Sequence, residues 1–568
     1  MNPLSLTANQ VLKTTLAVQI LTCCLLSQSG FAQDSFPVSI QVDAAKSKGP
    51  LRPIWRFFGA DEPNYAYMKD GSKLLGQLGE LSPQMVFFRT HNLLTSGDGT
   101  PALKWGSTNA YTEDIHGNPV YDWTIVDRIF DTYLARGVRP YVQIGFMPKA
   151  LSSNPDPYQH QFGSGATFEE LFCGWAQPPK DYDKWGELVY QWTKHCVERY
   201  GEKETLTWYW QTWNEPDIPY WKGTPEQFFK LHDVAIASVR RALPGAKVGG
   251  PDVANGGSDF MSSFLKHCVE ETNYSTGEKG TPLDFVSFHA KGSPEFVEGH
   301  IRMGINKHLQ AIESGFQSIA KYPQLKSLPI ILGESDPEGC AACRGDRYGY
   351  RNGTMYSSYT AASFARKHDL AAKHDLNLEG ALTWAFTFED QPYFAGFRQL
   401  ASNGLPLAAM NVFRMMSKVH GERVFVESSH AIQLEELTRN GARGTPDVAA
   451  IASRDEKQIA IMVWHYHDDD IAGPDAAIEL MIDGIPTHAT SAKLTHYRVD
   501  QFHSNPYDTW RRMGSPKAPN PKQYTELESA SQLATINADE QLTITNGNGK
   551  LSFKLPRQGV SLIVVEYP

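Results

Sequence analysis

Short apolar segments alternate with amphipathic segments of helical periodicity from about residue 54 to residue 389. Eight of the apolar segments are predicted strands, at residues 55–61, 85–92, 140–147, 208–215, 247–252, 284–290, 330–334 and 381–388. The helices predicted between them include residues 123–136, 182–200, 225–243 and 356–374. This alternation predicts an α/β fold, a (β/α)8 TIM barrel. The alternative, a doubly wound open sheet, would normally show a glycine-rich phosphate loop after an early strand, and no such loop is present in the sequence.

Beyond Val419 the pattern changes to short segments in which apolar and polar residues alternate. Strands are predicted at residues 448–453, 458–465, 476–482, 494–500, 541–545 and 560–567. Val38, Ile40 and Val42 alternate in the same way and can add a strand to the same sheet. Such alternation is typical of a half-buried antiparallel sandwich. We therefore expect a barrel domain at residues 46–422 and a β-sandwich accessory domain at residues 33–45 and 423–568.

The first residues have the features of a removable leader. Lys13 precedes an apolar stretch at residues 14–27, and small residues at 30–32 form a cleavage site. This predicts a signal peptide at residues 1–32 and a secreted or periplasmic protein. The apolar stretch is short for a bilayer span, so no stable membrane insertion is expected. Lipoprotein anchoring at Cys23 is disfavoured, because the apolar run ahead of it is short.

Composition limits the classes of partner. The formal net charge is −10, and a mildly acidic surface argues against a nucleic-acid partner. Aromatic residues make up 11% of the chain and include 13 Trp. Such rings can serve as stacking platforms for sugars or can fill large cores, and composition does not separate these two uses. The sequence leaves the oligomeric state open.

Five cysteines follow the leader: Cys173, Cys196, Cys268, Cys340 and Cys343. An odd number excludes a complete disulfide framework. Cys340 and Cys343 follow a predicted strand closely, and a local disulfide between them is one possibility that the sequence leaves open.

We expect no metal and no other cofactor, because no cysteine or histidine set stands at zinc-ligand spacing. Residues 465–470, His-Tyr-His-Asp-Asp-Asp, contain metal-ligating side chains. They fall at a strand end in the second domain, and we interpret them as a solvated turn.

Two glutamates stand at the ends of predicted barrel strands. Glu215 lies between Asn214 and Pro216 after the tryptophan-rich fourth strand, and Glu334 ends the seventh. The C-terminal ends of barrel strands form the active face, so we expect both carboxylates at the barrel mouth. Two carboxylates flanking one sugar are what glycosidic cleavage requires. Asp336 and Glu338 are competitors for Glu334, but we expect them to be less well fixed because they lie beyond the strand end.

These motifs resemble glycoside hydrolase family 39, the family of β-xylosidases and α-L-iduronidases within the retaining clan A. The resemblance starts from Trp213-Asn-Glu-Pro216 and the glutamate that ends the seventh strand. It is carried further by Phe88-Arg-Thr-His91, Asp284-Phe-Val-Ser-Phe-His289, Phe397-Arg-Gln-Leu-Ala-Ser-Asn-Gly-Leu-Pro406, Tyr497-Arg-Val-Asp500, His503-Ser-Asn505, Trp510 and Gly514-Ser-Pro516. It thus extends over nearly the whole chain after the leader.

The resemblance implies that Glu215 is the general acid/base and Glu334 the nucleophile. Asn214 would hold the hydroxyl next to the anomeric carbon. A nucleophile needs a lowered pKa, which a neighbouring guanidinium supplies, and an acid needs a raised one. We expect indole surroundings and the charge of Glu334 to raise the pKa of Glu215.

The remaining substrate-binding candidates are His289, Arg89, His91, Trp384 and Phe388. The resemblance implies that His289 lies near the nucleophile and that Arg89 keeps the nucleophile ionised. Trp384 and Phe388 either contact substrate or serve in packing.

We therefore predict an exported retaining glycosidase that acts on an oligosaccharide or glycoside, with β-xylosidase as the leading activity. Alternatives of the same class are α-L-iduronidase-like, arabinosidase-like or endo-acting cleavage. The alternative of another class is a non-catalytic carbohydrate-binding protein. Family members commonly follow the nucleophile with an aromatic residue and then Asn or Ser, whereas Glu334 is followed by Ser335-Asp336-Pro337. That departure leaves the sugar open, together with its linkage and the choice between exo and endo action.

Overall fold

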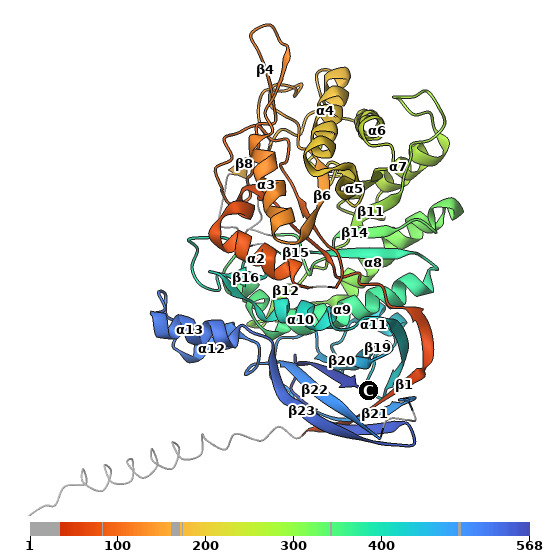
Figure 1. Cartoon of the computed structure of the whole chain (residues 1–568), viewed down its shortest axis with the longest axis vertical. Coiled ribbons are helices and arrows are strands. Elements are labelled where there is room, and N and C mark those ends of the chain that lie inside the picture. Colours follow the sequence, from red (N-terminus) through yellow and green to blue (C-terminus); the bar gives the residue numbers. More distant parts are fainter. Residues whose placement is uncertain are drawn as a thin grey trace, which may run out of the picture.

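A computed structural model of the chain describes residues 35–81, 83–160, 171–172, 174–340, 343–385, 387–486 and 490–567. The predicted signal peptide and Cys173 lie outside these residues. Figure 1 shows a helix-wrapped barrel stacked along the long axis on a β domain, which the red N-terminal strand joins. Among the described residues, none of the helices combines the length and the apolar character that a membrane crossing requires.

The upper part is a closed parallel barrel, and the predicted (β/α)8 fold is confirmed. Within the described residues eight strands form it, each paired in parallel with the next and the last with the first. In order around the barrel they are β2 (Phe57–Ala60), β3 (Val86–Thr90), β6 (Val138–Ile144), β9 (Tyr209–Thr212), β10 (Lys247–Val253), β11 (Phe285–His289), β14 (Ile330–Glu334) and β15 (Leu378–Trp384).

Helices cover the outside of the barrel (Figure 1). The four predicted by range are α3 (Thr124–Ala135), α4 (Tyr182–Tyr200), α6 (Pro225–Ala242) and α9 (Thr354–Lys373). The structure adds α2 (Lys69–Gly79), the short α5 (Glu202–Thr205), α7 (Asp259–Glu270), α8 (Ile305–Ala320) and α10 (Ala408–Met416). Their starts follow from local chemistry. The Asp181 carboxylate accepts from two backbone N–H groups at the start of α4, and Thr224 and Gln227 form a capping box on α6.

Side chains fill the barrel interior. The packed cluster is mostly aromatic and consists of Phe57, Phe87, Tyr141, Tyr209, Phe285, Ile331, Leu382 and Trp384. Because a filled barrel is no channel, the chemistry is confined to its rim.

The lower part is a closed, mostly antiparallel β structure, which confirms the predicted second β domain. In the described residues its strand order is β1 (Phe36–Pro50), β18 (Glu422–Ser428), β19 (Asp447–Arg454), β20 (Gln458–Tyr466), β25 (Val560–Glu566), β22 (Ser491–Val499), β23 (Ala534–Thr545), β24 (Asn548–Leu555) and β21 (Ala476–Asp483). The strand expected around Val38 is β1, which pairs antiparallel with β18 and parallel with β21. Strands β18 and β24 were not predicted from the sequence, because both expose much of their length and carry few apolar side chains.

A helical excursion leaves the β domain between β22 and β23. It contains α12 (Pro506–Arg512) and α13 (Pro521–Ala530), which project to one side in Figure 1. The Tyr524 hydroxyl on α13 donates to the backbone oxygen of Asn403 in the barrel, at 3.1 Å. The excursion therefore brings residues of the β domain to the barrel. These two helices are not among those predicted from the sequence.

Residues 465–470 connect the two parts, and the prediction of a solvated turn is wrong. The Asp468 carboxylate is fully buried and accepts from the backbone N–H of Ile305 at the start of α8, at 2.9 Å. Arg302 pairs with Asp469 at 2.6 Å. Together these residues form an interdomain brace.

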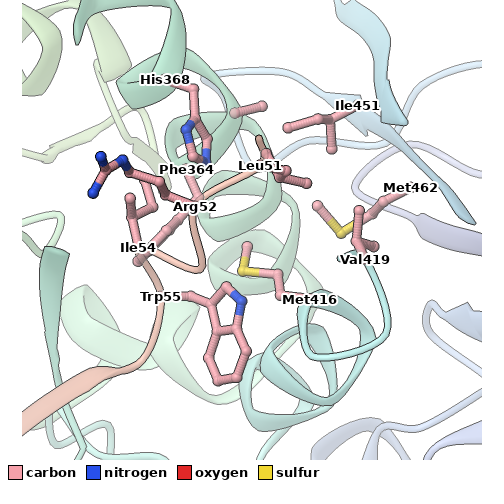
Figure 2. Close-up of a pocket in the computed structure, with 11 residues that line it drawn as sticks. Leu51, Arg52, Ile54, Trp55, Phe364, His368, Met416, Val419, Ile451 and Met462 are labelled. Carbon is pink, nitrogen blue, oxygen red and sulfur yellow. The ribbon is translucent and has the colours of Figure 1, made fainter. Parts of the chain in front are cut away.

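A small apolar cavity also lies where the parts meet. Figure 2 shows Phe364 and His368 of α9 and Met416 of α10 facing Ile451 and Met462 of the β domain. Its volume is about 30 Å³. A space of this size holds about one water molecule, so we assign it no ligand.

Candidate active site

The structure brings the two predicted glutamates together at the barrel mouth. Glu334 ends β14, and Glu215 follows β9 by three residues. One oxygen of each carboxylate and a ring nitrogen of His289 all lie within 4.8 Å of one another. All three side chains are buried. This separation leaves room for one sugar carbon between the carboxylates, as a retaining glycosidase requires.

The backbone at these two positions is tightly specified. The predicted strand at 208–215 stops at Thr212, and Trp213 and Glu215 adopt positive φ angles of 69° and 47°. Such angles are uncommon for residues other than glycine and occur where function requires them. The Glu215 N–H donates to the backbone oxygen of Asp252, at 2.8 Å. Beside Glu334, a Cβ on Gly333 would clash with the carboxylate of Asp252.

Lys291 lies between the two carboxylates and was missed by the sequence analysis. Its Nζ is 2.7 Å from Glu215 Oε1 and 2.8 Å from Glu334 Oε2. Burial alone would lower the pKa of Lys291, but the two carboxylates outweigh it and the pKa is raised. The only signal in the sequence was its position two residues after His289, just beyond the sixth strand.

The carboxylates are anionic in this arrangement. Burial favours protonated Glu334, but Lys291, His289, His91 and Arg398 outweigh burial and hold the pKa of Glu334 well below its usual value. The same balance, dominated on the lowering side by Lys291 and His289, lowers the pKa of Glu215. The expectation of a raised pKa for Glu215 is therefore wrong for this structure, because no ammonium between the carboxylates was foreseen.

Arg89 organises the floor of the site from β3. Its Nη2 donates to Asn214 Oδ1 at 3.0 Å and lies 3.3 Å from the Asp252 carboxylate. Its Nη1 is 3.7 Å from Glu334, so the guanidinium lies beside the nucleophile candidate as expected. The Asn214 amide nitrogen is buried and has no hydrogen-bond partner among the described residues. It is therefore available to a sugar hydroxyl.

The two histidines contact different carboxylates. His289 Nδ1 donates to Glu215 at 2.8 Å and lies 3.7 Å from Glu334. His91 Nδ1 donates to Asp61 at 2.9 Å, while its Nε2 lies 3.5 Å from Glu334. Burial lowers the pKa of His91, so its ring is neutral near pH 7.

The two aromatic candidates, Trp384 and Phe388, have different neighbours. Trp384 is fully buried beneath the site, with its ring centroid 5.1 Å from that of His91. Phe388 is 1% exposed, and its ring packs against Phe397 with centroids 4.9 Å apart. Phe388 is therefore a packed core residue, whereas Trp384 is packed next to His91 of the catalytic cluster.

Arg398 is a second cation that the sequence analysis did not single out. It lies 3.3 Å from Glu334 and 3.5 Å from Asp336, with its guanidinium 5.0 Å from the Trp384 ring. Asp336 is buried and accepts from the Trp384 backbone N–H and the Tyr356 hydroxyl. The expectation that Asp336 is less well fixed than Glu334 is therefore wrong.

The loop after Glu334 is closed by the disulfide that the sequence left open. Cys340 and Cys343 are joined, with their Cα atoms 5.4 Å apart. Arg351 donates to the backbone oxygens of both cysteines and pairs with Glu338. The disulfide and the contacts of Arg351 therefore both fix this loop.

A metal ion would have to compete with Lys291. Among the described residues, one group of three potential ligands is compact enough to hold an ion: Glu215, His289 and Glu334. The ammonium of Lys291 already lies between the two carboxylates, at hydrogen-bond distance from both. We therefore assign this group no metal.

The barrel and its buried pair of carboxylates define the class, a glycosidase. The family model "Glycosyl hydrolases family 39" matches residues 38–545, and the chain belongs to that family. It is therefore a retaining glycosidase, and the alternative of a non-catalytic binding protein is set aside.

Relatives that match most of the chain include β-xylosidases and α-L-iduronidases. The chain is 26% identical to a β-xylosidase of Geobacillus stearothermophilus over 79% of this chain and 81% of that one. It is 23% identical to the α-L-iduronidase of Mus musculus over 86% and 75% of the two chains. The structure of a bacterial orthologue of human α-L-iduronidase matches with a TM-score of 0.74, at 18% identity, over 93% of this chain and 84% of that one.

Proposed function

We propose that Glu334 and Glu215 carry out a double displacement on a β-xyloside, with Glu334 as the nucleophile and Glu215 as the acid/base. The observation that carries this proposal is the approach of their oxygens to within 4.8 Å in a buried site. Inverting enzymes need a wider gap, because a water molecule must fit beside the sugar.

The reaction follows from this geometry. Glu334 attacks the anomeric carbon as the bond to the leaving oxygen breaks, and Glu215 donates its proton to that oxygen. A covalent glycosyl ester on Glu334 results. Glu215, now a carboxylate, takes a proton from water as the water oxygen attacks the same carbon and releases Glu334. Arg89 holds the Asn214 amide so that it can bind the hydroxyl beside the anomeric carbon.

Glu215 must gain a proton before it can act as an acid. In this structure Lys291 and His289 keep it ionised. We propose that the entering sugar separates Lys291 from Glu215, so that the charge of Glu334 and the buried surroundings raise the pKa of Glu215. Substrate binding and protonation of the acid are then coupled.

One relative supports a pentoside as the substrate, and two features of the chain support export. The β-xylosidase of Geobacillus stearothermophilus matches over most of both chains. The leader predicted at residues 1–32 supports a secreted or periplasmic enzyme, as does the disulfide after β14, because disulfides persist in oxidising compartments.

A uronoside is the second candidate. Lys291 and Arg398 both lie within 3.3 Å of Glu334 Oε2 and present two cations at the same side of the site. A sugar carboxylate would find charge-assisted partners there, as an α-L-iduronidase-like activity requires. The murine relative supports this candidate.

Hydrolysis of an aryl β-xyloside and of an aryl α-L-iduronide distinguishes the two candidates. Glu215→Gln and Glu334→Gln should each lower the preferred activity by about 10³-fold, given the usual size of acid–base contributions. Glu202→Gln, at an exposed glutamate on the outside of the barrel, is the matched control and should retain activity. Proton NMR should show that the first-formed sugar keeps the anomeric configuration of the substrate. A first product of the opposite configuration would contradict the proposal.

A further inference from the structure

A second cleft opens beside the barrel mouth, and we call it the lateral cleft. Its volume is about 680 Å³, within the range of ligand sites. One wall is the hairpin of β12 (Glu295–Val297) and β13 (His300–Arg302), and a second is the 3-10 helix η3 (Asp346–Asn352). The third wall is α12, from the helical excursion of the β domain that projects to the side in Figure 1.

The lateral cleft lies on the active face of the barrel. The hairpin follows β11 and η3 follows β14, so both come from C-terminal ends of barrel strands. The Tyr350 hydroxyl in the cleft wall donates to Glu338 Oε1 at 3.5 Å. Arg398 donates to the backbone oxygen of the same residue and also contacts Glu334. Glu338 and Arg398 thus connect the cleft wall to the catalytic cluster.

Aromatic rings line the lateral cleft. Phe296 on the hairpin is 49% exposed, an unusual position for a ring of this size. Across from the hairpin, Tyr507 and Trp510 stack nearly parallel, at 24° and with centroids 6.0 Å apart. The Trp510 Nε1 donates to the backbone oxygen of Pro516 at 2.9 Å, which fixes the plane of the indole. Rigid rings of this kind offer apolar faces to the C–H groups of a sugar.

Carboxylates among the rings supply hydrogen-bond acceptors. Asp470 lines the cleft with its side chain exposed, and its carboxylate accepts no hydrogen bond from the described residues. Asp346 and Asp508 line the same cleft, and Arg511 is the arginine in its lining. Carboxylate oxygens accept well from sugar hydroxyls, whereas three carboxylates against one guanidinium repel an anionic ligand.

We propose that the lateral cleft binds a neutral oligosaccharide segment of the glycan on which the enzyme acts. This inference rests on the proposed function for the identity of the glycan. The cleft holds the chain beside the mouth and raises the local concentration of its ends at the catalytic cluster. The helical excursion of the β domain then takes part in binding, because α12 carries the stacked rings Tyr507 and Trp510.

Binding is tested separately from hydrolysis, by affinity electrophoresis of Glu334→Gln in gels that contain one soluble polysaccharide each. The panel is xylan, arabinan, β-glucan, galactan and, as the anionic member, polygalacturonate. We expect retardation by at least one neutral polysaccharide and none by polygalacturonate.

Two substitutions probe opposite walls. Phe296→Ala and Trp510→Ala should each weaken the binding by about tenfold, the scale of one aromatic contact. Phe296 is exposed, so its removal leaves folding intact even if loss of Trp510 does not. Phe502→Ala is the matched control, because this ring of the same excursion is 64% exposed and lies outside the cleft lining. It should bind as the parent protein does.

The outcomes separate the two proposals. The proposal that the lateral cleft binds a neutral oligosaccharide is overturned if no neutral polysaccharide retards the protein. It is also overturned if Phe296→Ala and Trp510→Ala both bind as the parent protein does. Retardation that both substitutions abolish supports it even if the protein with an intact Glu334 fails to hydrolyse an aryl xyloside. In that case only the proposed substrate is overturned.

Discussion

At the scale of single residues, Lys291 sets the charge of the site. One ammonium lies within hydrogen-bond distance of both candidate catalytic carboxylates, and both have lowered pKa values because of it. A low pKa suits Glu334, which must attack as a carboxylate. It opposes Glu215, which must first donate a proton.

Lys291→Met should therefore move the pH profile of kcat/KM upward at both limbs. Without the ammonium the pKa of Glu334 rises, so activity is lost at a higher pH on the acid side. The pKa of Glu215 rises too, so the basic limb also moves up. We expect kcat/KM at its optimum to fall by about 10²-fold, as for a lost electrostatic contact. Lys307→Met, which removes an exposed lysine, is the control. An unchanged profile would show that Lys291 does not act on the pair.

Glu62 should make stability fall with rising pH. Burial raises the pKa of Glu62 to about 8, although the hydrogen bond from the Lys104 N–H partly offsets this rise. In the unfolded chain the pKa is near 4.5, so between these values only the unfolded state releases the proton. The stabilisation present below pH 4.5 is thus lost as the pH rises through 8.

Glu62→Gln removes this titration. We measure the free energy of unfolding in urea at pH 5 and at pH 8. Between these two pH values, we expect it to fall by about 1–3 kcal/mol less in Glu62→Gln than in the parent protein. The exposed Glu456→Gln should behave as the parent does. Identical pH dependence in Glu62→Gln would show that Glu62 is ionised at neutral pH in the folded protein.

Site residues that stand in motifs at strand ends could be predicted from the sequence, whereas residues that only the fold brings next to them could not. Glu215 and Glu334 end predicted strands, and both lie at the mouth. Lys291 lies beyond the strand motif of His289, and only the fold brings its Nζ between two carboxylates. Arg398 lies 64 residues from Glu334 along the chain, on a loop with no periodicity to place it.

At the scale of elements, β14 delivers Glu334 only because the residue before it is glycine. Gly333→Ala should lower stability by about 1–3 kcal/mol, because the added Cβ clashes with Asp252 and either the strand or the aspartate must move. Since Asp252 also contacts Arg89, kcat should fall as well. Gly76→Ala on α2 meets no atom closer than 3.6 Å and should be neutral or slightly stabilising. Thermal melting and xyloside hydrolysis of the two variants test this difference.

The barrel could be predicted element by element, because buried parallel strands read as apolar runs and their helices have a clear period. The end of strand β9 could not be predicted from the sequence. Its aromatic run continues to Trp213, whereas the strand stops at Thr212 because the backbone turns to positive φ. The helices α12 and α13 were missed because each is short, at seven and ten residues, and largely exposed.

At the scale of the whole molecule, the two parts are joined by buried polar contacts as well as by apolar packing. Asp468 accepts from the Ile305 N–H at the start of α8, from the Ala442 N–H and from the Tyr466 hydroxyl. A carboxylate at a helix N-terminus is favoured by the helix dipole as well as by its hydrogen bonds. The β domain thus stabilises a barrel helix directly, and the two parts should unfold together.

Asp468→Ala breaks this connection and leaves three buried donors without their acceptor. Each unsatisfied group is costly, so we expect a loss of about 2–4 kcal/mol. Because the loss falls on the contact between the parts, scanning calorimetry should resolve the single transition of the parent protein into two, with the first at lower temperature. Asp156→Ala, an exposed aspartate of the barrel, should leave one transition at the parent temperature. If Asp468→Ala also melts in one transition at that temperature, apolar packing between α9 and the β domain must suffice to couple the two parts.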